Sequence, residues 1–396
     1  MNTFSTYIGK LLYKKVLANF SKTGIPFTTP DGIHHVFDSE SRSIDPIKVN
    51  DWSFFTDLVY GYDLGFAKSY IDGKWTHSDL TELFKYISIT SGQEKRQLIS
   101  KIAPLKIYSQ IIQSFRVRNT RKQSRNNIKS HYDISNDFFS CFLDPSLTYS
   151  CAIYKDSSTS LEDAQAEKIN VMIKSASVKP NDHILDIGSG WGNLPIIAAS
   201  DYGAKVSAIT LSENQHNYSK RKFATLGLND AIDVQLLDYR DLSGKYNHIF
   251  SVEMIEAIGH KGIGNFFSKC ASLLSTDGTL QLQVITIPDE RYEAYRKNCD
   301  FIQKYIFPGG LLLPTGIIKK TASDCGFQIY RESEIGSHYP RTLITWQKNL
   351  EKNRQLIFDL GFNETDYRRF FYYFSYCAGA FKSGHISNFQ FSFKKK

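Results

Sequence analysis

The sequence has 396 residues, more than one typical domain, and its 41% hydrophobic and 22% charged residues are ordinary for a globular protein. No stretch approaches the roughly eighteen uninterrupted apolar residues that a membrane-spanning helix needs, and the six cysteines show no metal spacing and no disulfide framework. The formal net charge of +8 favours an anionic partner such as a phospholipid surface. We expect a two-domain cytoplasmic protein without a metal site.

The first predicted element is a helix over residues 4–20. Its apolar residues recur at helical spacing, namely Ile8, Leu11, Leu12, Val16 and Phe20. Lysines occupy other positions, so this basic amphipathic helix is suited either to rest on acidic lipid or to pack on its own domain. The sequence leaves both interpretations open.

The next segment, residues 26–46, is turn-rich and partly alternating, which indicates short strands. A helical pattern follows through Leu80, Leu83, Phe84 and Ile87. We interpret residues 1–115 as a small accessory domain that binds lipid.

A basic run occupies residues 116–130 and contains no acidic side chain between Arg116 and Lys129. It is either a solvated linker or a cationic patch that docks on phosphate head groups. No base-reading signature accompanies it, so we expect no nucleic-acid partner.

Strands and helices alternate over residues 131–396. Strands are predicted around residues 184–187, 205–211, 234–237, 249–252 and 280–287. Helices are predicted around residues 160–175, 193–202, 214–226 and 264–274. This order is typical of a parallel sheet covered on both faces, with ligands at the carboxyl ends of its strands. The three lysines at 394–396 are expected to form a frayed tail.

A glycine corner follows the first of these strands, with Gly188, Gly190 and Gly192 leading into a helix. Such a turn lets a ligand lie against bare backbone. The spacing differs from the dinucleotide fingerprint, and short glycine patterns also occur without a ligand.

From Trp52 to near the C-terminus the motifs together resemble the cyclopropane-fatty-acyl-phospholipid synthase family, which includes the mycolic acid cyclopropane synthases. The matching segments are Ser69–Trp75, His131–Asp133, Asn136–Asp137, Tyr149–Cys151, the glycine corner with Trp191, Thr210–Gln215, Asp238–Leu242, Glu253–Gly259, Tyr305–Gly310 and Cys377–Phe381. The resemblance implies an α/β Rossmann-like class I methyltransferase with a seven-stranded, mostly parallel sheet and a smaller N-terminal α+β domain.

The family transfers a methylene carbon from S-adenosylmethionine (SAM) to a cis double bond of a phospholipid acyl chain. A cyclopropane ring closes through a carbocation that bound bicarbonate deprotonates. The resemblance therefore implies SAM and bicarbonate as cofactors and unsaturated phospholipid as partner. We expect peripheral contact with the inner face of the membrane, and a homodimer is considered.

The resemblance also implies which residues line the cofactor. These are Tyr149, Ser150, Ile184, Leu185, Asp186, Ile187, Gly188, Ser189, Gly190, Trp191, Gly192, Thr210, Leu211, Ser212, Gln215, Tyr239 and Arg240. Thr210 stands where many class I methyltransferases have an acidic residue that binds the ribose.

Holders of the bicarbonate are implied in the same way. They are Cys151, largely through its backbone, together with Glu256, Ile285 and Tyr339. Gln283 stands where better-known members have histidine, and Cys377 is included although packing is its favoured role. The match places Glu256, rather than the nearby Glu253, at the site.

Two other functions are considered. Related enzymes on this scaffold methylate small amines or give methyl-branched lipids. A non-catalytic lipid-binding protein that retains a methyltransferase shell is the other alternative, and the absence of a thermal shift with S-adenosylhomocysteine would favour it.

Overall fold

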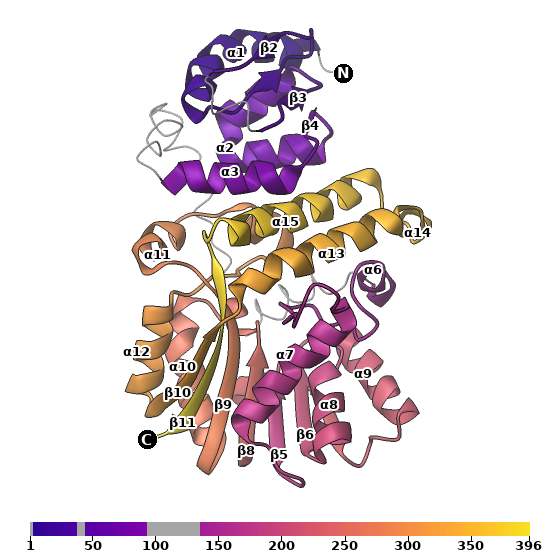
Figure 1. Cartoon of the computed structure of the whole chain (residues 1–396), viewed down its shortest axis with the longest axis vertical. Coiled ribbons are helices and arrows are strands. Elements are labelled where there is room, and N and C mark those ends of the chain that lie inside the picture. The colour runs from indigo at the N-terminus through magenta and orange to yellow at the C-terminus, as the bar shows by residue number, and fades with distance from the viewer. Residues whose placement is uncertain (1–2, 38–43, 93–134) are drawn as a thin grey trace. The chain divides into compact units, whose positions relative to one another are not determined.

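The computed structural model describes residues 3–37, 44–92 and 135–396, which belong to two compact units (Figure 1). The first unit comprises Met1–Arg116, Lys297–Ile306 and Leu350–His385. The second unit comprises the remaining segments. The predicted boundaries near residues 115 and 130, and the basic run between them, lie outside the described residues and stay predictions.

The first unit combines helices with a small sheet. Its strands, in the order β2-β1-β3-β4, are β1 (Phe27–Thr28), β2 (His34–His35), β3 (Ile47–Val49) and β4 (Trp75–Thr76). Its helices are α1 (Thr3–Thr23), α2 (Ser53–Ile71), α3 (Leu80–Gly92), the short η6 (Ile302–Ile306), α14 (Arg354–Asp359) and α15 (Glu364–Lys382). The predicted N-terminal helix, short strands and helix through Leu83 are present.

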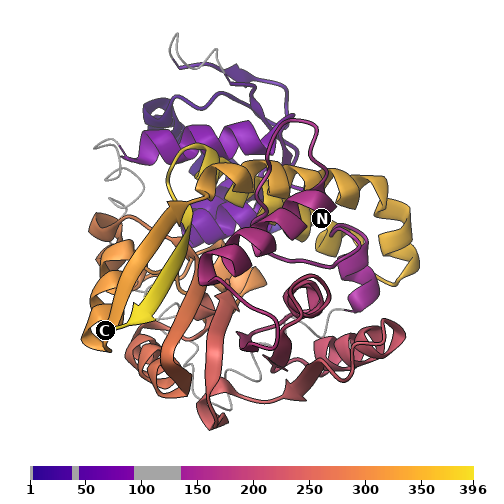
Figure 2. The same ribbon diagram turned by 60° about the horizontal axis from the view of Figure 1, so that its bottom comes forward.

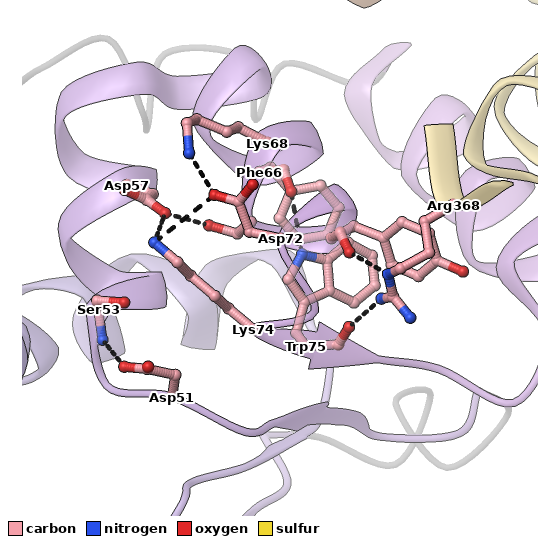
Figure 3. Close-up of polar contacts among 11 residues, drawn as sticks. Asp51, Ser53, Asp57, Phe66, Lys68, Asp72, Lys74, Trp75 and Arg368 are labelled. Carbon is pink, nitrogen blue, oxygen red and sulfur yellow. Dashed lines mark hydrogen bonds and ion pairs between the residues drawn. The ribbon is translucent and has the colours of Figure 1, made fainter. Parts of the chain in front are cut away.

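Residues from the C-terminal part of the chain belong to this unit, and one arginine links them to its N-terminal part (Figure 3). Arg368 on α15 donates from Nε to the carbonyl of Tyr70 at 2.6 Å and from Nη2 to the carbonyl of Trp75 at 3.1 Å. Its guanidinium lies 4.1 Å from the centroid of the Tyr70 ring, which adds a cation–π contact. Close by, Lys74 pairs with Asp57 at 2.5 Å. The Ser69–Trp75 motif thus anchors α15 within the unit.

The second unit contains a seven-stranded sheet in the order β10-β11-β9-β8-β5-β6-β7 (Figures 1 and 2). The strands are β5 (His183–Ile187), β6 (Lys205–Thr210), β7 (Ile232–Leu236), β8 (Tyr246–Val252), β9 (Leu274–Thr286), β10 (Phe327–Glu334) and β11 (Ser387–Lys395). β11 runs antiparallel to both neighbours, and the pairs from β9 to β7 are parallel. The predicted mostly parallel sheet is confirmed.

Helices cover both faces of this sheet because its central strands are apolar on both sides. Ile184 packs with α7 (Leu161–Ala176), α8 (Asn193–Tyr202) and α9 (Glu213–Thr225). Leu185 points the other way, into the cluster with α10 (Ile263–Leu273) and α12 (Thr315–Asp324). The remaining helical elements are α6 (Asn136–Ser140), η3 (Tyr239–Asp241), η4 (Ile255–Ala257), η5 (His260–Gly262), α11 (Asp289–Tyr295), η7 (Gly336–His338) and α13 (Tyr339–Lys352).

The C-terminal lysines correct one prediction. Residues 394–396 were expected to fray, yet β11 continues to Lys395, whose Nζ donates to the carbonyl of Leu274 at 3.1 Å. Pairing with β9 and β10 supplies backbone partners that a local pattern does not reveal. In the described ranges, no helix is long and apolar enough to cross a bilayer.

Alanine substitutions in the glycine corner should differ sharply in cost. A Cβ on Gly192, at a φ of +87°, would meet Cζ of Phe223 at 2.5 Å, whereas one on Gly190, at +56°, meets nothing within 4 Å. We expect Gly192→Ala to lower the free energy of unfolding by about 2–4 kcal/mol and Gly190→Ala by about 1–2 kcal/mol. Urea unfolding of both variants measures this, and equal losses would contradict the packing argument.

Candidate active site

The glycine corner places bare backbone at the carboxyl end of β5. Gly188 has a φ of +85°, and its N–H and that of Ser189 both donate to the carbonyl of Ile209 on β6 at 3.0 Å. The Ser189 hydroxyl oxygen is buried and has no hydrogen-bond partner. Together with the open space beside Gly190, these features fit a bound polar ligand.

Several other predicted cofactor residues lie at this edge of the sheet, after β6 and β7. Thr210 donates from Oγ1 to Oε1 of Gln215 at 2.8 Å, and the Ser212 hydroxyl caps α9 by accepting from the Gln215 N–H at 3.3 Å. Leu211 lies between them in the chain. After β7, Tyr239 and Arg240 form η3, and burial raises the pKa of Tyr239 to about 12.

A buried lysine, which sequence reasoning missed, contacts Ser150, another predicted cofactor residue. Lys168 on α7 is 1% exposed, and its Nζ donates to the Ser150 hydroxyl at 2.6 Å. Burial lowers the pKa of Lys168, and burial raises the pKa of Asp186 to about 7 against the opposing charge of Lys168. Lys168 lies four residues after Ala164 and four before Met172, which are both buried. A charged residue at a core position of a helix was therefore the sequence signal that could have identified it.

Aromatic side chains connect the glycine corner with Tyr339. The ring centroid of Trp191 lies 4.9 Å from that of Phe139, which lies 5.4 Å from that of Tyr149. Tyr149 in turn lies 5.2 Å from Trp346, and Trp346 lies 6.3 Å from Tyr339. We call these five residues the aromatic cluster. Its rings offer π faces that attract positive charge.

The carboxylate of Glu253 accepts four hydrogen bonds from four separate segments. Oε1 accepts from the Cys151 backbone N–H at 3.0 Å, from Gln283 Nε2 at 2.9 Å and from Asn388 Nδ2 at 2.6 Å. Oε2 accepts from the Tyr339 hydroxyl at 2.7 Å. The residues that supply these donors are all 4% exposed or less, so water has little access to the donor groups that hold the carboxylate.

The backbone of Glu253 is strained. Its φ of +50° lies in the left-handed region, directly after β8, where a residue with a Cβ is disfavoured. Its N–H donates to the carbonyl of Gln283 at 2.8 Å, which helps to hold the conformation. Strain of this kind concentrates at functional sites, where surrounding contacts maintain it.

Glu256 lies beside Glu253 but in a different environment. Its Oε1 accepts from the Ile285 N–H at 2.7 Å, while its Oε2 is buried without a hydrogen-bond partner. Burial, and next the charge of Glu253, raise the pKa of Glu256 to about 8. Both effects favour the protonated form of Glu256.

The two predicted cysteines have different surroundings. Cys151 is buried, and desolvation and then the charge of Glu253 raise the pKa of its thiol, so its backbone N–H and carbonyl make the contacts that matter. Cys377 lies on α15 in the first unit, whereas the other predicted site residues belong to the second unit. Desolvation of the thiolate and the charge of Asp300 raise the pKa of Cys377.

This geometry does not fit the expected bicarbonate. The Cys151 N–H and the Tyr339 hydroxyl, which were expected to hold it, bind the carboxylate of Glu253 instead. Glu256 bonds to the Ile285 N–H, apart from those donors. Glu253, which the sequence comparison set aside, thus occupies the centre of the predicted anion site.

Comparisons with known proteins agree with the methyltransferase fold. A family model described as mycolic acid cyclopropane synthetase matches residues 119–391. The chain is similar to the tuberculostearic acid methyltransferase UfaA1 of Mycobacterium tuberculosis, with 35% identity over 342 residues, 83% of this chain and 78% of that protein.

The chain is also similar to the cyclopropane-fatty-acyl-phospholipid synthase of Escherichia coli K12, with 32% identity over 352 residues, 88% of this chain and 87% of that protein. Among solved structures, it is similar to the mycolic acid cyclopropane synthase CmaA1 complexed with S-adenosylhomocysteine (SAH) and CTAB. The TM-score is 0.65 at 33% identity, and the match covers 68% of this chain and 98% of that one.

Replacing Glu256 by glutamine should change how stability depends on pH. Between about pH 4.5 and pH 8 the unfolded chain releases the Glu256 proton while the folded chain keeps it, so the native protein loses stability as pH rises through this window. Glu256→Gln has no such proton to release. We expect its free energy of unfolding, relative to the native protein, to rise by about 2–4 kcal/mol across the window.

Urea unfolding at pH 5 and pH 8 measures this difference. Glu334→Gln removes an exposed carboxylate that accepts from the Ser387 hydroxyl and provides the baseline for a surface site. A Glu256→Gln difference that stays constant with pH would show that Glu256 is ionised in the folded chain.

Proposed function

The chain belongs to the mycolic acid cyclopropane synthetase family of SAM-dependent methyltransferases, and on this premise we propose that it adds a one-carbon unit to the cis double bond of a phospholipid-bound acyl chain, closing a cyclopropane ring. The observation that carries the proposal is the Glu253 carboxylate, fixed by four donors beside the aromatic cluster. An alkene acceptor needs a base at this place, because attack on an electrophilic methyl leaves a cation that must lose a proton.

The glycine corner and the residues that follow β6 and β7, which together we call the cofactor edge, suit SAM. The glycine corner would receive the methionine portion together with Tyr149 and Ser150, while Thr210 and Gln215 would meet the ribose and Tyr239 with Arg240 the adenine. When bound there, SAM supplies an electrophilic methyl group. The unpartnered Ser189 hydroxyl and the open space beside Gly190 support this assignment.

The residues between the cofactor edge and Glu253 have two tasks. The rings of Tyr149, Trp346 and Tyr339 stabilise positive charge on the acyl chain and exclude water that would capture it. Glu253 accepts the proton at Oε2, which carries a single hydrogen bond, whereas Oε1 already accepts three. The raised pKa of the neighbouring Glu256 disfavours a second negative charge beside Glu253.

The names of similar proteins support an acyl acceptor, since they describe a cyclopropane-fatty-acyl-phospholipid synthase and a cyclopropane mycolic acid synthase. A methyl-branched product is the second candidate, because the tuberculostearic acid methyltransferase is similar over most of the chain. An amine acceptor is less well supported, since its lone pair needs no stabilised carbocation.

We further propose that α1 brings the protein to an anionic leaflet on the inner face of the membrane. Tyr7 and Leu11 are 64% and 59% exposed, and Lys10 and Lys14 are exposed on the same helix. Apolar side chains interleaved with cations suit a peripheral contact with acidic phospholipid.

Incubation with SAM and vesicles of a cis-unsaturated phospholipid should convert the acyl chains to products heavier by one CH₂ unit. Cyclopropane and methylene-branched products have the same mass, so proton NMR of the extracted lipid must separate high-field ring protons from vinyl protons. Ring protons support the proposal, and =CH₂ protons, which the unreacted acyl chain lacks, establish a methylene branch, from which a methyl branch forms only by a separate reduction. If SAH raises the melting temperature of the protein but no lipid is modified, the proposal of an acyl acceptor is overturned.

Replacing the proposed base should abolish turnover without loss of the cofactor. We expect Glu253→Gln to lower kcat by about a hundredfold or more, because the amide keeps the shape but accepts no proton. SAH affinity, followed by thermal shift, should stay within about twofold. Glu334→Gln on the surface of β10 is the matched control. A Glu253→Gln enzyme with native kcat would exclude Glu253 as the base.

A chemical-rescue experiment tests the same assignment from the other side. Glycine tolerates the φ of +50° at position 253 and leaves the donors around Tyr339 unoccupied. Added bicarbonate or formate should therefore restore part of the activity of Glu253→Gly but none of that of Glu253→Gln, whose side chain fills the site. The native enzyme should keep its rate in bicarbonate-free buffer, and a strict bicarbonate requirement would contradict an internal base.

A further inference from the structure

The last strand in the chain, β11, carries two amide side chains that are linked to the proposed base, Asn388 directly and Gln390 through Gln283. Asn388 donates from Nδ2 to Glu253 Oε1 at 2.6 Å, and Gln390 donates from Nε2 to Gln283 Oε1 at 3.0 Å. They are two residues apart, so both side chains lie on one face of the strand. Neither residue belongs to a segment that the sequence singled out.

Gln390 determines which end of the Gln283 amide faces Glu253. The two glutamines are direct cross-strand partners of β11 and β9. Because Gln390 donates to Oε1 of Gln283, the Gln283 NH₂ group is directed to Glu253 Oε1 at 2.9 Å and to the Cys151 carbonyl at 3.2 Å. A reversed amide would set its carbonyl against two other acceptors.

The hydrogen bond from Asn388 to Glu253 leaves the other polar atom of the Asn388 amide without a partner. Asn388 is fully buried, and its own Oδ1 has no hydrogen-bond partner. A buried carbonyl oxygen without a donor is destabilising, and an apolar side chain at this position would avoid that loss. The contact that compensates is the hydrogen bond to the charged Glu253, the shortest of its four.

We propose that Asn388 and Gln390 are positioning residues that hold Glu253 so that only Oε2 faces the acyl chain, and that they thereby determine where the substrate cation loses its proton. This inference rests on the proposed function. With Asn388, Gln283 and the Cys151 N–H on Oε1, the carboxylate can neither rotate nor exchange its two oxygens.

The position of the base decides among three fates of the cation. Loss of a proton from the added methyl to Glu253 joins that carbon to the cationic carbon and closes the ring. If the base is misplaced, a hydride from the adjacent carbon moves first, and proton loss then gives a methylene branch of equal mass. Capture by a water molecule, which releases a proton, gives a methyl-branched alcohol heavier by one water.

The test compares product ratios among variants of the full chain. We expect Asn388→Leu and Gln390→Leu to lower kcat by about tenfold or more and to change the ratio of ring, methylene and alcohol products, measured by NMR and mass spectrometry. The apparent KM for lipid and the thermal stabilisation by SAH should stay within about twofold. Gln390→Leu supplies a second readout if Asn388→Leu folds poorly.

The matched control breaks a similar pair farther along the same two strands. Ser392 on β11 donates to Oε1 of Gln281 on β9 at 2.6 Å, away from Glu253. Ser392→Ala should keep the native rate and product ratio. If Glu253→Gln is inactive while Asn388→Leu and Gln390→Leu match Ser392→Ala, the positioning role is overturned and the proposed function stands. If Glu253→Gln remains active, the base itself is misassigned and both fail.

Discussion

The hydrogen bonding of one carboxylate, that of Glu253, is the interaction on which the candidate site depends. A partly buried anion is stable only where donors replace water, and here they come from the segment at Cys151, from β9, from the start of α13 and from β11. These segments meet only when the sheet is complete. The insertion of β11 beside β9 is therefore part of the site as well as of the fold.

The same edge of the sheet holds two carboxyl groups in different environments. Glu253 has four donors, whereas Glu256 has one backbone donor and a buried, unpartnered oxygen, and its pKa rises to about 8. Separate environments let neighbouring acids take separate roles, with Glu253 as the proposed base and Glu256 as a group whose raised pKa favours the neutral form.

Strained backbone is concentrated at this edge. The three glycines of the corner and Glu253 all have positive φ at the carboxyl ends of β5 and β8. Glycine accepts this conformation readily, and Glu253 keeps it because its side chain and its N–H are both bonded. The parallel strands provide the rigid framework that such strain needs. The aromatic cluster extends from the glycine corner to Tyr339.

Local patterns in the sequence determined much of the fold and the cofactor edge. Apolar runs such as Ile184–Ile187, the glycine spacing and the polar residues after each strand are read from neighbouring positions, and the family motifs added the methyltransferase assignment. The placement of Thr210 at the end of β6 and of Gln215 in the first turn of α9 followed from this order. Strands β10 and β11 were not predicted from the local pattern, although the alternation of Phe389, Phe391 and Phe393 is a strand signal for β11.

Only the tertiary structure decided how the anion site is filled. Sequence motifs favoured Glu256 over Glu253, since they carry no information on the backbone torsion that turns Glu253 toward the donors. Asn388 lies 135 residues from Glu253, and Lys168 reaches Ser150 from a helix on the face of the sheet. Such contacts depend on strand order and register, which the chain acquires only when its distant segments pack together.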